Sequence, residues 1–75
     1  MTRYIDRDDH SGVIRYELGD DYIKIEFQNN SIYLYSYSSS GENHIETMKE
    51  LAMSGYGLNS YINKYVKLSY ESKLR

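Results

Sequence analysis

The sequence of 75 residues contains no cysteine, no proline and no tryptophan, and it has a single phenylalanine. Without cysteine there is no disulfide framework, no thiolate metal site and no cysteine nucleophile. No apolar run approaches the ~20 residues that cross a bilayer. The stretch from Met1 to Asp6 also lacks the apolar centre of a secretion signal. We therefore expect a cytoplasmic protein that has no membrane partner.

A chain this short forms one small domain, because it buries only ~60% of the surface of its unfolded state and cannot build a second core. Its net charge of −2 argues against a strong polyanion binder, since that affinity comes mostly from lysine and arginine displacing counterions. The charge is uneven, because residues 61–75 carry four basic side chains and one acidic one. The chain is therefore acidic with a basic C-terminal end.

Tyrosine is the abundant aromatic residue, with ten copies. Tyr33, Tyr35 and Tyr37 occupy every second position of one stretch, so on a strand they share one face of a sheet. Tyrosine buries its ring while its hydroxyl reaches water or a partner. The row can therefore serve as core or as a binding surface, depending on which face it occupies.

The turn before this row decides the face. A two-residue turn at residues 29–30 would place the tyrosines on the outer face of the sheet. An odd-numbered turn with an asparagine in the left-handed conformation would pair Phe27 with Tyr33 and Ile25 with Tyr35, which directs the row inward. The strand is apolar on both sides, so alternation alone leaves both registers open.

Three stretches alternate with period two and predict strands over residues 13–18, 22–27 and 31–37. Residues 1–12 are charged and lack periodicity, so we expect a mobile leader. This leader includes the acidic run Asp8-Asp9-His10, which we interpret as solvated because three adjacent residues do not easily converge on one metal ion.

Helices are predicted in the second half of the chain. Residues 36–43 are polar and predict a mobile loop. Asn43 is the expected N-cap of a helix over residues 44–53, with Glu46 at the reciprocal capping position, and Gly55 suits its C-terminal end. A second, short helix is expected over residues 58–66, where packing must stabilise it.

The predicted fold is α+β: a three-stranded antiparallel β-meander followed by two short helices packed on one face. The domain limits are a leader at 1–12, one domain at 13–67 and a frayed basic C-terminus at 68–75. The core candidates are Ile14, Tyr16, Ile23, Ile25, Phe27, Tyr35, Met48, Leu51, Leu58 and Ile62.

This order of elements resembles the KTSC domain, a short bacterial module named after the C-terminus of certain lysyl-tRNA synthetases. The residues that carry the resemblance are Ile14-Arg15-Tyr16-Glu17, the Ile23/Ile25/Phe27 alternation, Tyr33-Leu34-Tyr35, Gly55, Leu58, Asn59 and Ile62. The Val-Pro that commonly precedes the family's first helix is absent, and the segment over residues 38–43 is longer.

The resemblance implies no established activity, and RNA binding is a suggestion drawn from the synthetase context. The family often has a charged residue between its two tyrosines. This implies that Tyr33 and Tyr35 face the helices, which leaves Ile32 and Leu34 as a small apolar patch on the open face.

The sequence predicts a binding module and not an enzyme, and no cofactor or metal is expected. His10 and His44 have no serine or carboxylate partner at a spacing typical of a relay. One expected function is protein–protein or self-association through the open sheet face or a sheet edge. The alternative is single-stranded RNA binding by tyrosines and the basic C-terminal helix. The candidate binding residues are Tyr37, Tyr56, Asn59, Tyr61, Lys64 and Lys67.

Overall fold

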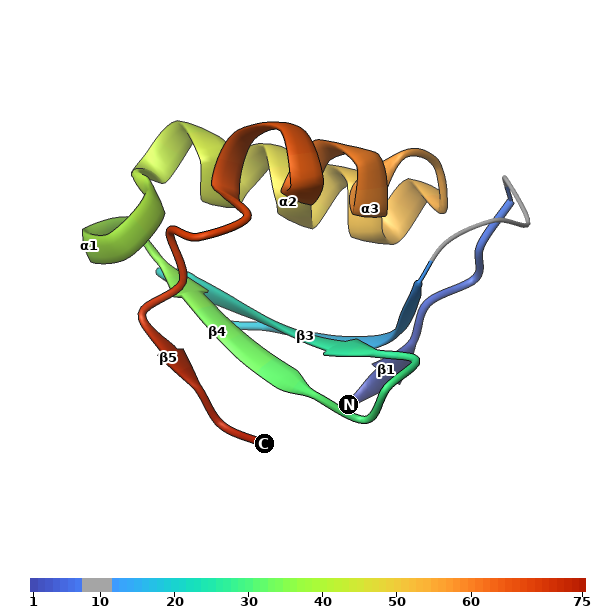
Figure 1. Cartoon of the computed structure of the whole chain (residues 1–75). Coiled ribbons are helices and arrows are strands. Elements are labelled where there is room, and N and C mark those ends of the chain that lie inside the picture. The colour runs from blue at the N-terminus through green and yellow to red at the C-terminus, as the bar shows by residue number, and fades with distance from the viewer. Residues whose placement is uncertain (8–11) are drawn as a thin grey trace.

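The computed structural model describes residues 1–7 and 12–75 and has an α+β fold, with helices covering one face of an antiparallel sheet (Figure 1). The five strands lie in sequence order across the sheet. They are β1 (Thr2–Arg3), β2 (Val13–Leu18), β3 (Tyr22–Phe27), β4 (Ile32–Ser36) and β5 (Ser72–Lys73). The helical elements are α1 (Tyr37–Ser40), α2 (Glu42–Ser54), α3 (Leu58–Tyr61) and the π-helical turn η1 (Ile62–Val66).

The predicted meander is present as β2, β3 and β4, but two short strands that the sequence did not predict extend it to five. Thr2 pairs with Tyr16, and the Tyr4 amide donates to the Ile14 carbonyl at 2.8 Å. The expectation of a mobile leader is therefore wrong for this N-terminal part. The N-terminal segment is ordered because the backbone groups on the outer edge of β2 need hydrogen-bond partners, and β1 supplies them. The run Asp8-Asp9-His10 lies outside the described residues.

The expectation of a frayed C-terminus over residues 68–75 is wrong in the same way. The Glu71 amide donates to the Leu34 carbonyl at 2.7 Å, and the Leu74 amide donates to the Ile32 carbonyl at 2.7 Å. These bonds satisfy carbonyls on the outer edge of β4. Figure 1 shows the chain returning from the helical layer so that β5 lies beside β4.

The turn between β3 and β4 has the odd-numbered form. The Phe27 amide donates to the Ser31 carbonyl at 2.9 Å, which closes a three-residue loop over residues 28–30. Asn30 has a φ of 69°, and no other described residue except glycine has a positive φ. The predicted left-handed asparagine is therefore confirmed.

This turn places the tyrosine row on the helix side of the sheet, as expected. Tyr33 lies opposite Ile25, and Tyr35 lies opposite Ile23. The expected pairing of Tyr33 with Phe27 was thus wrong by two residues along the strand. Because the side-chain period is two, an error of two residues leaves the face unchanged.

A β-bulge in β2 explains why one core prediction failed. Val13 pairs with Phe27 while Arg15 pairs with Glu26, so Ile14 is an extra residue in the strand. The bulge turns Val13 into the core at 5% exposure, and the predicted core residue Ile14 stays partly exposed.

The expected polar loop over residues 36–43 is instead a short helix. The Ser36 hydroxyl accepts from the Ser39 amide at 3.2 Å, and the Ser39 hydroxyl accepts from the Ser36 amide at 3.0 Å. This reciprocal capping box starts α1. The next helix, α2, begins at Glu42 after Gly41, so Asn43 is not its N-cap.

The later helix boundaries agree with the sequence. Gly55 is left-handed with a φ of 83° and ends α2, as predicted. A Cβ at Gly55 would lie 2.2 Å from the Ile5 carbonyl oxygen, so glycine also allows the N-terminal segment to cross this turn closely. Together α3 and η1 span the predicted second helix.

The core lies between the sheet and the helices. The confirmed core candidates are Ile23, Ile25, Tyr35, Met48, Leu58 and Ile62. The candidates that pack at its border, and are not fully buried, are Tyr16, Phe27 and Leu51. The buried apolar residues outside that list of candidates are Tyr4, Val13, Ile45, Ala52 and Val66.

The turn that sets the tyrosine register can be tested by substitutions at Asn30. Asn30→Val should lower the free energy of unfolding by about 1–2 kcal/mol, because a side chain with a Cβ branch is strained in the left-handed conformation. Asn30→Gly should leave it within about 0.5 kcal/mol of wild type, since glycine adopts positive φ without strain but adds freedom to the unfolded chain. Urea denaturation measures both values.

The neighbouring Asn29 supplies a control, because its Oδ1 accepts from the Ser31 amide at 3.1 Å. Asn29→Gly should lower the free energy of unfolding by about 1 kcal/mol through the loss of this hydrogen bond. Equal effects of glycine at positions 29 and 30 would contradict the assigned roles.

Candidate functional site

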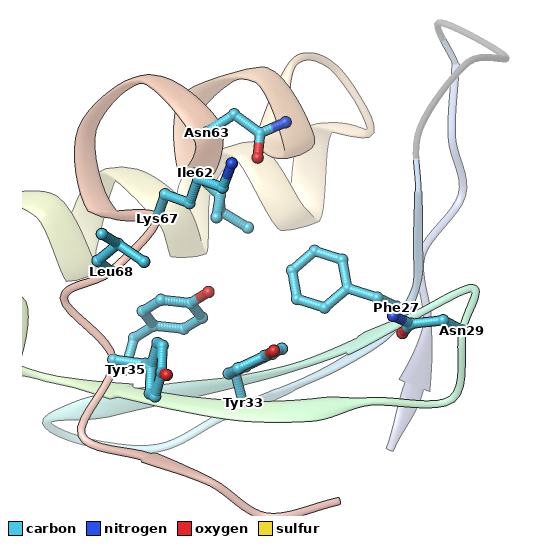
Figure 2. A pocket seen from close by; sticks show the side chains of 9 residues that line it. Phe27, Asn29, Tyr33, Tyr35, Ile62, Asn63, Lys67 and Leu68 are labelled. Carbon is cyan, nitrogen blue, oxygen red and sulfur yellow. The ribbon is translucent and has the colours of Figure 1, made fainter.

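A cavity of about 280 Å³ lies between the sheet and η1 (Figure 2). Its floor is formed by the buried side chain of Tyr35 from β4, and the buried side chain of Ile62 from η1 lies on the opposite side. Its walls carry the rings of Phe27, Tyr33 and Tyr70. The cavity is therefore mainly aromatic.

The alternation of β4 and its register against β3 place these rings together. Tyr33 is at the centre, with its ring centroid 5.6 Å from that of Phe27, 6.4 Å from that of Tyr35 and 4.8 Å from that of Tyr70. These distances lie in the range of favourable aromatic pairs. The rings thus form a connected wall.

The π-helical turn supplies the opposite side. In a π-helix the backbone bonds run from residue i to i+5, so residues five apart lie on neighbouring turns. Ile62 and Lys67 are five apart, and both line the cavity together with Asn63 and Leu68. Wider turns of this kind are frequent at functional sites.

The fourth ring comes from the C-terminal strap, which we define as residues 69–75. The Ser40 hydroxyl donates to the Ser69 carbonyl at 2.6 Å, and the Arg75 Nε donates to the Asn30 carbonyl at 2.8 Å. Between these two anchors β5 pairs with β4. The strap therefore holds Tyr70 beside Tyr33.

An ion-pair network on the opposite face of the sheet fastens the strap. Glu26 is only 6% exposed, and its carboxylate accepts from Arg15 at 3.2 Å and from Arg75 at 3.0 Å. A buried carboxylate requires such partners, because an unpaired charge away from water is costly. Two arginines from distant parts of the chain supply them here.

The mouth of the cavity is polar and basic. Asn29, Asn63 and Lys67 are exposed lining residues. The Lys73 ammonium lies 5.9 Å from the centroid of the Tyr33 ring. The mouth therefore offers one cation and two amide groups beside an aromatic interior, and a second cation lies near the Tyr33 ring.

Of the six predicted binding residues, only Lys67 lines this cavity. Tyr37 belongs to α1, and its hydroxyl donates to Glu46 at 2.6 Å. This hydrogen bond raises the pKa of Tyr37 to about 12 and lowers the pKa of Glu46. The Tyr37 hydroxyl is thus already bound within the chain.

Tyr61 and Lys64 belong to a second aromatic group on the helical layer. The Tyr61 hydroxyl lies 2.6 Å from His44 Nδ1, and its ring centroid lies 4.6 Å from that of Tyr65. The Lys64 ammonium lies 5.2 Å from the Tyr65 ring centroid. These rings pack against one another and do not line the aromatic cavity.

The last two predicted residues are also away from the cavity. Tyr56 is 53% exposed in the turn between α2 and α3. Asn59 does not cap the second helix, because Gly57 is the N-cap and no side chain bonds there. Sequence reasoning missed Phe27, Tyr33 and Tyr70 as site residues, although the inward tyrosine row was a usable signal for Tyr33.

In the part of the chain that the structure describes, no three histidine or acidic side chains gather as a metal site. No helix formed by the described residues has the length and apolar character needed to cross a bilayer.

Comparisons with known proteins found no family model that matches the chain, and no matching curated protein or solved structure. The resemblance to the KTSC domain therefore stays a prediction from the sequence.

Substitution of Tyr37 tests whether its hydroxyl is committed to Glu46. Tyr37→Phe should raise the pKa of Glu46 toward its ordinary value of 4.5, while Lys49, whose ammonium lies 2.9 Å away, keeps part of the shift. Because folding lowers this pKa, the pair stabilises the fold above pH 4.5 and loses that contribution as the pH falls through the folded-state value. Carboxyl ¹³C shifts followed by NMR measure the titration.

The matched control is Tyr22→Phe, because the Tyr22 hydroxyl donates to Glu17 at 3.0 Å in the same manner. It should raise the pKa of Glu17, which this bond lowers, and leave Glu46 unchanged. A Glu46 titration that Tyr37→Phe does not move would contradict the assignment.

The role of Arg75 in fastening the strap can be measured by amide hydrogen exchange. Arg75→Ala removes the bonds to Glu26 and to the Asn30 carbonyl, so the Glu71 and Leu74 amides should exchange faster. Arg15→Ala is the control, since it removes the other partner of Glu26 but leaves the strap anchored. Equal exchange in the two variants would show that Arg75 does not hold the strap.

Proposed function

We propose that this chain is a small non-enzymatic binding module for single-stranded RNA, and that an unpaired base enters the aromatic cavity. The supporting observation is the cavity itself, which sets the rings of Phe27, Tyr33 and Tyr70 beside exposed lysines. Unpaired bases stack on such rings while nearby cations hold phosphates. One site thus offers both kinds of contact that a nucleotide makes.

The size of the cavity supports a single ring system as the occupant. Its volume of about 280 Å³ lies just below the range of ~300–1,000 Å³ for pockets that hold drug-sized ligands. A single nucleobase is small enough for a cavity of this volume. The rest of the strand would lie outside, along the mouth.

The distribution of charge supports modest and salt-dependent binding. Lys67 lines the mouth and Lys73 of β5 lies beside the Tyr33 ring, whereas Lys64 of η1 lies over the Tyr65 ring, outside the cavity lining. The remainder of the chain is acidic, since the net charge is −2 despite these residues. We therefore expect micromolar affinity at low salt and weak binding at high salt.

Protein–protein or self-association through the sheet is the second candidate function. It is favoured by Ile32 and Leu34, which are only partly buried and belong to the face opposite the helices. The same face carries the ion pairs of Glu26, and a further pair joins Lys24 and Glu17 at 3.4 Å. Since β1 and β5 cover the meander edges in part, neither edge is a long open strand. The charged side chains on this face and the covered edges favour the aromatic cavity over the sheet as the binding site.

Titration of a fluorescent oligouridine tests the proposed function. The logarithm of the binding constant should fall with the logarithm of salt with a slope of about −1.4 to −2, because each phosphate neutralised on a single strand contributes about −0.7. Lys67→Ala should weaken binding severalfold and reduce the magnitude of this slope by about 0.7.

Lys24→Ala is the control, since Lys24 belongs to the face opposite the helices and is not a lining residue. It should bind as wild type does. Absence of binding at low salt, together with dimers in sedimentation, would replace this proposal with self-association.

A further inference from the structure

The floor of the aromatic cavity carries one hydroxyl group, that of Tyr35. Tyr35 is 2% exposed, yet its hydroxyl makes no hydrogen bond to any residue within 1–7 or 12–75. Figure 2 shows this hydroxyl directed into the cavity, toward the space between Ile62 and Phe27. A ligand that occupies the cavity can therefore reach this hydroxyl and supply the partner that the described chain does not.

The chemistry of this hydroxyl indicates what it would bind. Burial raises the pKa of Tyr35, so the group keeps its proton across the neutral range. The oxygen of a phenol shares electron density with its ring, which makes the O–H a better donor than acceptor. A ligand that enters to the floor of the cavity must therefore carry a hydrogen-bond acceptor on its leading edge.

We propose that Tyr35 determines the specificity of the cavity by donating a hydrogen bond to a ring carbonyl oxygen of the entering base. This inference rests on the proposed binding of single-stranded RNA. The ligand class is a flat heterocycle that bears a carbonyl, and uracil is its simplest representative among the bases.

The surroundings of Tyr35 fit such a ring. Phe27 and Tyr33 lie beside it as an edge-to-face pair, with ring centroids 5.6 Å apart and an interplanar angle of 74°, so one of the two can stack on the entering ring while the other borders its edge. The amides of Asn29 and Asn63 lie at the mouth and can bond the polar atoms that remain outside. An apolar ring of the same shape would pack against the aromatic side chains but would offer the Tyr35 hydroxyl no hydrogen-bond acceptor.

A comparison of two strands isolates this hydrogen bond. One is a short oligouridine, and the other carries difluorotoluene in place of uracil, which keeps the ring shape but has poor acceptors. Wild type should bind the uridine strand about tenfold more tightly, as expected for one hydrogen bond at a buried site. Tyr35→Phe should bind the two strands equally, with the affinity that wild type has for the isostere.

Tyr16→Phe is the matched control, because Tyr16 packs at the border of the same core but does not line the cavity. Tyr16→Phe should still bind the uridine strand about tenfold more tightly than the difluorotoluene strand. Tyr35→Phe loses no hydrogen bond within the described chain, so its thermal unfolding should match that of wild type. If Tyr35→Phe does not fold, two measurements on wild type decide the role of the Tyr35 hydroxyl. One is its preference between the two strands, and the other is a shift of the Tyr35 ring signals when uridine monophosphate binds.

The outcomes separate the two proposals. If wild type binds neither strand, RNA binding and this inference are both overturned. If wild type binds both strands equally, or if Tyr35→Phe keeps the preference, the role of Tyr35 is overturned while stacking of a base in the cavity stands.

Discussion

The three-residue turn over residues 28–30 is the constraint on which the rest of this structure depends. A left-handed Asn30 closes the loop and fixes how β4 pairs with β3. Because side chains alternate along a strand, a shift of one residue would exchange the faces of β4. Tyr33 and Tyr35 would then face away from the helices, and Ile32 and Leu34 would take their place. The aromatic cavity exists because the turn selects one of these two arrangements.

Two further segments, both distant in sequence from the turn, complete the cavity. The π-helical turn brings Ile62 and Lys67 to the same side, and the C-terminal strap adds Tyr70. The strap depends on Arg75, which reaches the buried carboxylate of Glu26 on the opposite face of the sheet. An ion pair on one face of the sheet thus anchors the segment that places the Tyr70 ring on the other face.

The sequence predicted most of the meander and the two main helical segments, because these rest on local patterns. Alternation identified β2 and β3, and Gly55 marked the end of α2. The odd-numbered loop was one of two hypotheses for this turn. It was selected by a resemblance and not by the residues of the strand themselves, since Ile32 and Leu34 are as apolar as their neighbours.

The missed features depend on pairing between distant residues. The edge strands are two residues long, too short for any periodic signal, and form because β2 and β4 offer unpaired backbone groups. The bulge at Ile14 is visible only when both strands are known. Tyr70 was assigned to a frayed tail because its neighbours show no pattern. Its place in the cavity depends on the hydrogen bonds that Ser40 and Asn30 make to the strap. Sequence patterns within the strap do not predict these bonds, because the partners are distant in sequence.

The most direct test of a base-binding cavity is an NMR experiment that records nuclear Overhauser effects between an oligouridine and the isotope-labelled protein. We expect contacts from the uracil ring protons to the rings of Phe27 and Tyr33. Contacts confined to Tyr61 and Tyr65 on the helical layer, or to Ile32 and Leu34 on the open face of the sheet, would contradict it.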